Sequence, residues 1–406
     1  MGSRCPRFPC YFADVADSAV RYDPFSYEIH EDPYPIYRRL RDESPAYFDE
    51  QHGFWALSRY ADVHRALHDY ETFSSAQGFL LEDIDDFTLP MLLGMDPPDH
   101  GRLRATISRA LTPRRVAMLE APIRDRCRAL IDGFAARGSA DLIGDFAALL
   151  PMWVISRLLG VPDGDQDELR RLADVMVHRE DGTRGVPPAG KEAAATIYGY
   201  FERLLAARAT GTGDDLLTLL LTAERAGEIS HLEIVGFCFL LIIAGNETTT
   251  KLLGNLAVQL AERPAVQARL VTEPERSPNA VEEMLRYDTS THMMARTLTR
   301  EVELHGRRME AGRKVALLLA SANRDERRWH EPDLFDLTRD TADHVAFGFG
   351  VHFCLGAALA RLEARVALEE LLARLPDFTV DRAGLVRVHS GNVRGYSVVP
   401  IEFRAR

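Results

Sequence analysis

Residues 347–363 read FGFGVHFCLGAALARLE and place one cysteine, Cys354, between a glycine-rich loop and the start of a helix. A thiolate there gains from the positive end of the helix dipole and from backbone N–H groups, so we expect its pKa to be lowered. Gly348, Gly350 and Gly356 allow positive φ or a close approach to a flat group. The alternative is that Cys354 is only a small buried hydrophobic residue.

The composition is that of an ordinary globular protein. Of the 406 residues, 46% are hydrophobic and 27% are charged, so we expect an extensive core, in one large domain or in two. A net charge of −12 argues against nucleic acid as the main partner. Residues 1–21 read as a loosely structured lead-in, and the protein is expected to be a monomer.

The sequence gives no indication of export or of a membrane anchor. The N-terminal residues lack a long apolar segment, and the apolar run 234–245 is too short to cross a bilayer. The five cysteines form no CxxC pair, which argues against a disulfide framework and against a zinc site. We therefore expect a cytoplasmic protein.

Helical periodicity dominates the chain, while strand patterns are short and lie toward its two ends. The segment 231–263 is long enough to cross a whole domain as one helix. A mainly α protein with small β-sheets is predicted.

The middle of that long helix, residues 242–251, reads IIAGNETTTK and turns from apolar to polar. An unpaired polar group inside a core costs several kcal/mol, roughly 2–7, so the change needs an explanation. Glu247 and Lys251 are spaced as a surface i,i+4 pair, and the threonines can bond to carbonyls one turn earlier. The other reading is that the helix carries chemistry here.

The run Phe347, Gly350, His352, Cys354, Gly356 resembles the haem-binding signature of the cytochrome P-450 family, here of the soluble bacterial kind. The resemblance implies a P-450 fold, as a single domain over 1–406, with haem b between the long central helix and the cysteine loop. It implies that Cys354 supplies the proximal thiolate to the iron. Phe347 and Gly348 would belong to the haem-binding segment with Gly350 and Gly356.

The sequence Ala244-Gly245-x-Glu247-Thr248 matches the oxygen-activating pattern of the same family. The resemblance implies that Ala244 and Gly245 leave a pocket above the iron, with the helix opening locally at Gly245. Thr248 and Glu247 would deliver protons to dioxygen at a site otherwise kept dry. This acid and alcohol pair points to O2 as cosubstrate and to an external source of electrons.

Two further sets of residues match the family's pattern. Glu283 and Arg286 stand three apart, and the resemblance implies a structural lock with Arg339, although such pairs are commonly surface salt bridges. His100 and Arg104 lie one turn apart and can point at one anion. In the family they grip the haem propionates together with residues that correspond to Arg296 and His352.

A hydrophobic substrate pocket is expected from the long loop before residue 99, the central helix and two later segments. Its predicted residues are Phe79, Leu80, Leu81, Phe87, Met91, Leu92, Ile243, Thr291, Met293, Met294 and Val393. The acids Glu82, Asp83, Asp85 and Asp86 offer an alternative contact for a cationic group of a substrate.

The predicted function is a monooxygenase that hydroxylates or epoxidises a hydrophobic small molecule. The sequence has no flavin or nicotinamide fingerprint, so a ferredoxin and a ferredoxin reductase would supply the electrons. An acidic ferredoxin would meet a basic patch formed by Arg102, Arg109, Arg114, Arg115, Arg361 and Arg365. The alternatives are a haem-thiolate protein that uses peroxide or acts as a sensor or isomerase, and a helical binding protein without haem.

Overall fold

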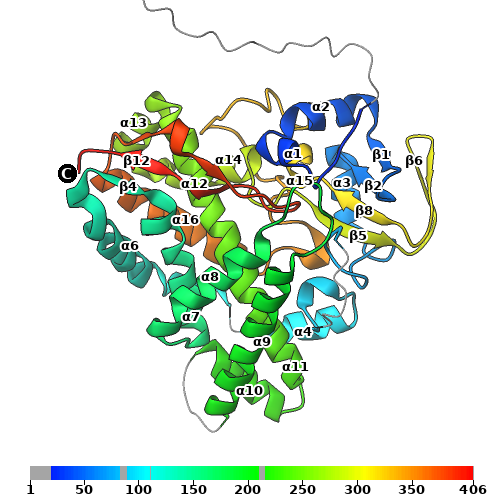
Figure 1. Cartoon of the computed structure of the whole chain (residues 1–406), viewed down its shortest axis with the longest axis horizontal. Coiled ribbons are helices and arrows are strands. Elements are labelled where there is room, and N and C mark those ends of the chain that lie inside the picture. Colours follow the sequence, from blue (N-terminus) through cyan, green and yellow to red (C-terminus); the bar gives the residue numbers. More distant parts are fainter. Residues whose placement is uncertain (1–19, 83–88, 110, 210–214, 406) are drawn as a thin grey trace, which may run out of the picture.

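The computed structural model describes residues 20–82, 89–109, 111–209 and 215–405. The predicted lead-in lies outside the described residues up to position 19. Helices fill the left and lower parts of the molecule in Figure 1, and the largest sheet lies at the upper right. The predicted class, mainly α with small sheets, is confirmed.

One long helix passes through the middle of the molecule. It consists of α11 (His231–Leu240), a π-helical turn (Leu241–Gly245) and α12 (Asn246–Ala261). In the described part of the chain it is the one helix long and apolar enough to cross a membrane, but 61% of its most apolar window is buried inside the protein. The sequence argument that the apolar run 234–245 is too short to cross a bilayer was therefore wrong, because the whole helix is long enough. Its burial identifies it instead as a core helix.

The remaining helices surround it, and several begin with the residues that favour helix starts. Thr112 and Asp215 accept hydrogen bonds from the backbone N–H groups of the first turns that follow them. The other α-helices are α1 (Tyr27–Glu31), α2 (Tyr34–Glu43), α3 (Tyr60–His68), α4 (Asp99–Ser108), α5 (Pro113–Ala117), α6 (Glu120–Phe134), α7 (Leu149–Leu159), α8 (Gln166–Val177), α9 (Pro188–Arg208), α10 (Leu216–Arg225), α13 (Pro264–Thr272), α14 (Ser277–Tyr287), α15 (Leu319–Ala322) and α16 (Ala357–Arg374).

The strands form one five-stranded sheet and three smaller sheets. The large sheet has the order β1-β2-β8-β5-β3, and β2 and β8 are its parallel pair. Gly53, Gly306 and Gly312 have positive φ at the turns between consecutive strands. The strands are β1 (Ala46–Asp49), β2 (Phe54–Leu57), β3 (Phe73–Ser74), β4 (Ser139–Asp141), β5 (Met294–Leu298), β6 (Val302–Leu304), β7 (Arg307–Met309), β8 (Lys314–Leu317), β9 (Thr379–Val380), β10 (Val386–Arg387), β11 (Tyr396–Val398) and β12 (Pro400–Glu402).

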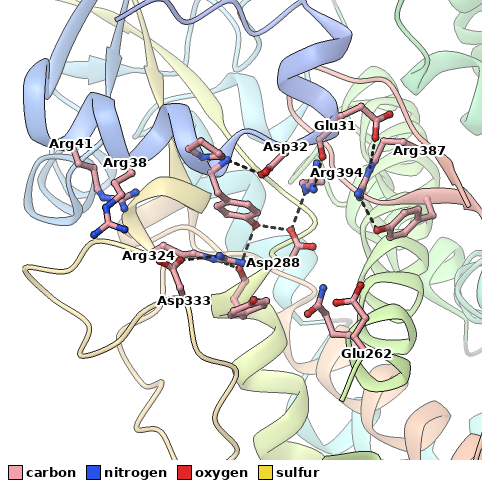
Figure 2. A pocket seen from close by; sticks show the side chains of 15 residues that line it. Glu31, Asp32, Arg38, Arg41, Glu262, Asp288, Arg324, Asp333, Arg387 and Arg394 are labelled. Carbon is pink, nitrogen blue, oxygen red and sulfur yellow. Dashed lines mark hydrogen bonds and ion pairs between the residues drawn. The ribbon is translucent and has the colours of Figure 1, made fainter. Parts of the chain in front are cut away.

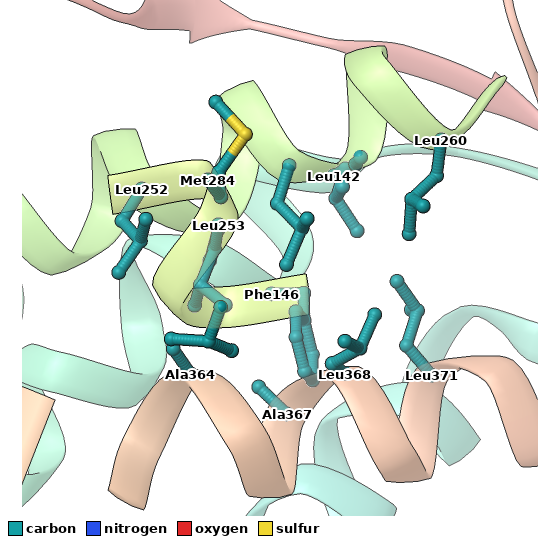
Figure 3. Packing of buried hydrophobic residues seen from close by; sticks show 14 of the residues in the cluster. Leu142, Phe146, Leu252, Leu253, Leu260, Met284, Ala364, Ala367, Leu368 and Leu371 are labelled. Atoms are coloured by element: carbon teal, nitrogen blue, oxygen red, sulfur yellow. The ribbon is translucent and has the colours of Figure 1, made fainter. Parts of the chain in front are cut away.

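The largest hydrophobic cluster fixes the central helix against α16. Leu252, Leu253 and Leu260 of α12 pack with Leu368 and Leu371 of α16 and with side chains of α6 and α14 (Figure 3). Each buried leucine contributes about 1.5–3 kcal/mol. Because α16 begins three residues after Cys354, this core also fixes the cysteine loop relative to the polar part of α12.

Candidate active site

The cysteine loop is closed by its own backbone. Cys354 donates a hydrogen bond from its N–H to the carbonyl of Phe347 over 2.9 Å. Gly348 and Gly350 have φ of +69° and +67°, and a Cβ on Gly350 would lie 2.9 Å from the carbonyl oxygen of Leu67. Glycine is therefore required at both positions. Gly356 has φ of −86° and instead leaves room beside the sulfur, since its Cβ would lie 4.0 Å from Sγ.

The Cys354 side chain is surrounded by protein but is exposed to a cavity beside it. Burial raises the pKa of Cys354, and the N–H of Gly356 and the charges of Arg104 and Arg361 offset this only in part. The expected lowering of the pKa is therefore wrong for the polypeptide alone, because the loss of hydration outweighs the helix terminus. A metal ion at the sulfur would remove the proton.

The cavity runs between the cysteine loop and the central helix. Ala244, Gly245 and Thr248 line it from the helix, and Cys354 lines it from the loop. Leu92, Thr291 and Met294 contribute to the same wall as predicted. The cavity also contacts residues that the sequence did not suggest, among them Leu93, Phe237, Leu240, Leu241, Leu285, Thr289 and Ser290. The helical spacing 237, 240, 241, 244, 248 was the signal that could have found the helix residues.

The central helix widens where the sequence turns polar. The π-helical turn Leu241–Gly245 ends one residue before α12. A Cβ on Gly245 would lie 2.7 Å from Cδ1 of Ile155 on α7, so the helices approach closely there. Thr248 donates its hydroxyl proton to the carbonyl of Ala244 over 2.8 Å. π-Turns often occur at functional sites, and this one adjoins the cavity.

Glu247 points away from this cavity into the protein. It is 2% exposed, and its carboxylate lies 3.1 Å from the Lys251 ammonium and 3.2 Å from the amide nitrogen of Asn246. The i,i+4 pair suggested by the sequence therefore exists, but it is buried and not on the surface. The carboxylate of Glu247 is therefore enclosed by protein and meets its neighbours rather than solvent.

Four nitrogen-bearing side chains converge on one side of the cavity: His100, Arg104, Arg296 and His352. The rings of His100 and His352 are 4.3 Å apart between centroids. Burial lowers the pKa of Arg296 to about 10, and burial together with the charge of Arg296 lowers the pKa of His352 to about 3. The structure thus brings together the four residues that the resemblance assigned to the two haem propionates.

These groups have no acidic partners in the described part of the chain. Neither Arg104 nor Arg296 forms a salt bridge there, and their hydrogen bonds go to the backbone carbonyls of Phe353 and Ala295. His100 Nε2 and both ring nitrogens of His352 have no well-aligned partner there. Buried donors and cations without partners are costly. The donor set, the thiol and the apolar walls therefore fit a haem with two propionates.

A buried ion pair joins α14 to the segment before the cysteine loop. Both oxygens of Glu283 lie 2.8 Å from the Arg286 guanidinium, and Arg339 Nε lies 3.2 Å from the same carboxylate. Arg286 also donates to the carbonyls of Asn323 and Pro332, each over 2.9 Å. The three residues predicted as a lock are in contact.

Glu282, the residue before Glu283, forms a second ion-pair lock. Its carboxylate lies 3.0 Å from His344 Nε2 and 2.6 Å from Arg361 Nε. Burial alone would raise its pKa, but hydrogen bonds from His344 and Arg361 lower the pKa to about 2. Arg361 lies 4.6 Å above the ring of Phe347, so this pair holds the cysteine loop from the other side.

Several predicted pocket residues lie elsewhere, because the loop that carries them folds onto the sheet. Leu81 and Met293 are each 1% exposed and pack in one cluster beneath the sheet. Ile243 packs against the α7–α11 cluster on another face of its helix. Phe79, Leu80, Met91 and Val393 also do not line the cavity, and Phe87 lies outside the described residues.

The prediction that acidic loop residues could contact a cationic group of a substrate is wrong for Glu82. Glu82 is 1% exposed and forms a salt bridge with Arg179 Nε over 2.9 Å. That carboxylate is therefore neutralised within the protein. Asp83, Asp85 and Asp86 lie outside the described residues.

The predicted basic patch is mostly neutralised. Four of its six arginines form salt bridges: Arg102 with Glu233, Arg109 with Glu228, Arg361 with Glu282, and Arg365 with Glu120 and Glu369. Arg114 and Arg115 on α5 are exposed, and no salt bridge to either is found in the described residues. The positive surface near the cysteine loop is therefore smaller than the sequence suggested.

A second hollow of about 660 Å3 lies between α1, α2, the ends of α12 and α14, and β10–β11 (Figure 2). Several of its charged groups have partners within the protein: Arg394 Nε lies 3.2 Å from Asp288, and Arg324 lies 3.7 and 3.8 Å from the ring centres of Tyr34 and Tyr287. The thiol does not line it. This hollow is a structural junction between the N-terminal and C-terminal parts of the chain.

Comparisons with known proteins agree with this arrangement. The family model for cytochrome P450 matches residues 186–382. A putative cytochrome P450 123 from Mycobacterium bovis is 44% identical over 398 residues, which cover 97% of this chain and 99% of the relative. The structure of cytochrome P450 CYP109Q5 from Chondromyces apiculatus has a TM-score of 0.86 and 37% identity, over 95% of this chain and 98% of that one.

CYP109E1 from Bacillus megaterium, solved in complex with testosterone, also has a TM-score of 0.86, with 31% identity over 93% of this chain and 99% of that one. Identity at this level over nearly the full length cannot arise from fold likeness alone. The chain belongs to the cytochrome P450 family, the haem-thiolate monooxygenases.

Proposed function

We propose that this monooxygenase hydroxylates or epoxidises a hydrophobic small molecule, in secondary metabolism or in the oxidation of lipids, steroids or terpenoids. The observation that carries the proposal is the apolar wall around Phe237, Leu240 and Leu285, which adjoins Thr248 and Cys354. Glu363, the one acid in the lining formed by the described residues, has its pKa raised to about 8 by burial and is neutral at pH 7. The testosterone complex of CYP109E1 is an example of such a ligand in a relative.

Haem b, ligated by the Cys354 thiolate, supplies the oxygen-activating chemistry of the family. In our proposal Arg104 and Arg296 neutralise the two propionates, and His100 and His352 donate hydrogen bonds to them. The lock of Glu283, Arg286 and Arg339 keeps the loop that carries the thiolate in place. The four propionate-binding side chains have no competing acidic partner among the described residues. The three residues of the lock are already paired with one another.

Thr248 would handle protons at the cavity wall. Its single hydroxyl proton is engaged by the Ala244 carbonyl, so in this state Oγ1 presents only lone pairs to the cavity. Rotation of the hydroxyl would turn the proton inward, and the widened turn gives it space. Glu247, the residue before Thr248, lies on another face of the helix and would replenish protons from the protein side.

Electrons would come from a separate ferredoxin and its reductase, in the cytoplasm. The exposed arginines Arg114 and Arg115 lie on α5, which packs against α16 close to the cysteine loop. Met118, three residues after Arg115, is 70% exposed. Phe353, on the cysteine loop, is 40% exposed. A small basic and apolar surface of this kind suits an acidic electron carrier.

Two measurements test the proposal. The carbon monoxide complex of the reduced protein is expected to show the strongly red-shifted Soret band of thiolate ligation, and an unshifted band would remove the assignment of Cys354. A panel of hydrophobic molecules screened by spin-state shift then identifies a ligand for turnover.

With that ligand, Thr248→Ala is expected to retain haem but to divert electrons into hydrogen peroxide. Thr250→Ala is the matched control, because the Thr250 hydroxyl bonds to Ala147 O over 3.2 Å and does not line the cavity. Unchanged coupling to product in Thr248→Ala would rule out its role in proton delivery. Efficient product formation from peroxide without a reductase would favour the peroxide-using alternative.

A further inference from the structure

One wall of the cavity is a short segment that belongs to no helix or strand. Residues 288–293 connect α14 to β5, and residues 289–291 within them line the cavity. The residue before these, Asp288, lines the second hollow instead and points toward Arg394 (Figure 2). Because no regular element holds the segment, its position depends on contacts with other parts of the chain.

Asp288 is buried and paired with residues from both ends of the chain. Its side chain is 7% exposed, and Oδ1 accepts hydrogen bonds from the Tyr34 hydroxyl over 2.6 Å and from Arg394 Nε over 3.2 Å. Burial alone would raise the pKa of Asp288, but the charge of Arg394 and the hydrogen bond from Tyr34 act in the opposite direction, and the pKa is lowered. The carboxylate is therefore charged at neutral pH.

Arg394 carries this contact to the cavity wall and to α1. Its backbone N–H donates a hydrogen bond to the carbonyl of Ser290 over 2.8 Å. Its guanidinium donates to the carbonyls of His30 and Glu31 at the end of α1, to that of Glu31 over 3.0 Å. One residue thus ties the backbone of the wall both to Asp288 and to the N-terminal helix.

The backbone of the wall is also paired with the residues just before Arg394. Thr291 and Val393 form an isolated antiparallel bridge, and the N–H of His292 donates to the carbonyl of Asn392 over 2.8 Å. The wall is therefore one side of a short pairing, and the side chain of Arg394 anchors the other side.

Asn255 joins this pairing to the central helix. It is 0% exposed on α12, and its Nδ2 donates to the carbonyls of Asp288 over 3.2 Å and of Arg394 over 3.3 Å. Thr248, seven residues earlier on the same helix, lines the cavity. A shift of Arg394 would therefore change the separation between the wall and the helix that faces it.

The ion pair is the part of this arrangement that one substitution can release. The side chains of Asp288 and Arg394 are 7% and 9% exposed, and a buried charge that loses its partner is costly. Without Asp288, the Arg394 guanidinium is expected to move toward solvent in the second hollow, which it also lines. The paired wall would then follow it.

We propose that Asp288 and Arg394 are positioning residues, whose ion pair sets the place of the wall formed by residues 289–291 and thereby decides how well a bulky hydrophobic ligand fits beside the haem. This inference rests on the proposed function, in which the cavity receives such a ligand. Neither residue lines the cavity, so the effect passes through the wall.

The first test compares two nitrogen ligands of haem iron, imidazole and 4-phenylimidazole, by the Soret shift of the ferric, haem-loaded protein. Only the second ligand carries a phenyl group that needs an apolar cavity. Asp288→Asn is expected to weaken 4-phenylimidazole binding about tenfold, because the ligand must order a wall that is no longer held, and to leave imidazole binding within about twofold. The readout is the ratio of the two dissociation constants, since a general loosening of the protein would weaken both. A wild-type ratio in Asp288→Asn would overturn the proposal.

Asp325→Asn is the matched control. Asp325 is 1% exposed and pairs with Arg327 over 3.1 Å, but it lies after α15 and does not line the cavity, so the ratio should stay at the wild-type value. The double variant Asp288→Asn/Arg394→Gln should lose less than the sum of the two single variants, because no uncompensated charge remains. Additive losses would overturn the role of the pair.

Hydrogen exchange reports on the wall directly and needs no added ligand. The amides of His292 and Arg394 are bonded to Asn392 and Ser290. In Asp288→Asn, peptides covering 288–294 and 390–396 are therefore expected to exchange about tenfold faster, whereas peptides from α16 should keep the wild-type rate. Wild-type rates in the first two peptides would overturn the proposal even if ligand binding changed.

The wild-type protein separates this inference from the proposed function. If it binds imidazole but not 4-phenylimidazole, the cavity does not accept a hydrophobic ligand, and both proposals fail. If it binds both ligands and Asp288→Asn keeps the wild-type ratio, only the positioning role of Asp288 and Arg394 fails.

Discussion

Lys251 Nζ lies 3.1 Å from Glu247 Oε2, and both side chains are only 3% exposed. A pair with the spacing of an ordinary surface salt bridge is thus held inside the protein, beside the helix turn that faces Cys354. Surface pairs of this spacing contribute about 0.3–0.5 kcal/mol. A buried pair behaves differently, because removing one partner leaves the other charge without hydration or compensation.

Lys251→Met is therefore expected to lower the free energy of unfolding by about 3–5 kcal/mol. The double variant Glu247→Gln/Lys251→Met should recover most of that loss, because no unpaired charge remains. Denaturant unfolding of the haem-loaded protein measures both. Arg171→Met, which breaks the exposed pair with Glu168, is the control and should cost no more than about 1 kcal/mol. Equal losses in Lys251→Met and Arg171→Met would contradict the burial argument.

The sequence predicted the cysteine loop and the pairs His100–Arg104 and Glu283–Arg286 from short spacings that helices and turns preserve. The resemblance to the family, and not spacing, added Arg296, His352 and Arg339 to these sets. The sequence did not predict Glu282 as a second lock, since its partners His344 and Arg361 are brought to it only by the tertiary fold. The pocket residues Leu81 and Met293 were misassigned for the same reason. Hydrophobicity shows that a side chain is buried but not which cluster buries it.

Gly245→Ala is expected to strain the contact between the central helix and α7. The new Cβ would lie 2.7 Å from Ile155 Cδ1, and overpacking of this size costs about 1–3 kcal/mol. Ile155→Val removes that methyl group, so it should destabilise the wild type but relieve part of the loss in Gly245→Ala. A double-mutant cycle on thermal unfolding measures the coupling.

Gly133→Ala on α6 is the matched control for this prediction. Nothing lies within 4 Å of its Cβ position, so alanine should stabilise the protein by about 0.5–1 kcal/mol through helix propensity. Additive effects of Gly245→Ala and Ile155→Val would show that the close approach of the two helices is not what requires glycine at 245.

Arg296→Leu is expected to weaken the hold on haem. The guanidinium is 3% exposed and forms no salt bridge with the described residues, so we assign its charge to a propionate. Losing a charged hydrogen bond costs about 1.5–3 kcal/mol, which corresponds to roughly 10- to 100-fold faster haem loss. Transfer of haem to excess apomyoglobin measures the rate. Arg300→Leu, with 62% of its side chain exposed beyond the end of the same strand, is the control. Equal rates in the two variants would contradict the assignment.

The pair of Glu282 with His344 and Arg361 predicts an acid-dependent loss of stability. The pKa of Glu282 is lowered to about 2 in the folded protein, against about 4.3 for an ordinary glutamate. Between these values the unfolded chain binds the proton more readily, so the stabilisation is complete above about pH 4 and is lost as the pH falls toward 2. The difference in free energy of unfolding between wild type and Glu282→Gln should therefore shrink from pH 6 to pH 3. Glu275→Gln, at an exposed position after α13, should follow the wild-type pH curve. A constant difference between wild type and Glu282→Gln across this range would mean that the carboxylate charge does not hold α14 to the cysteine loop.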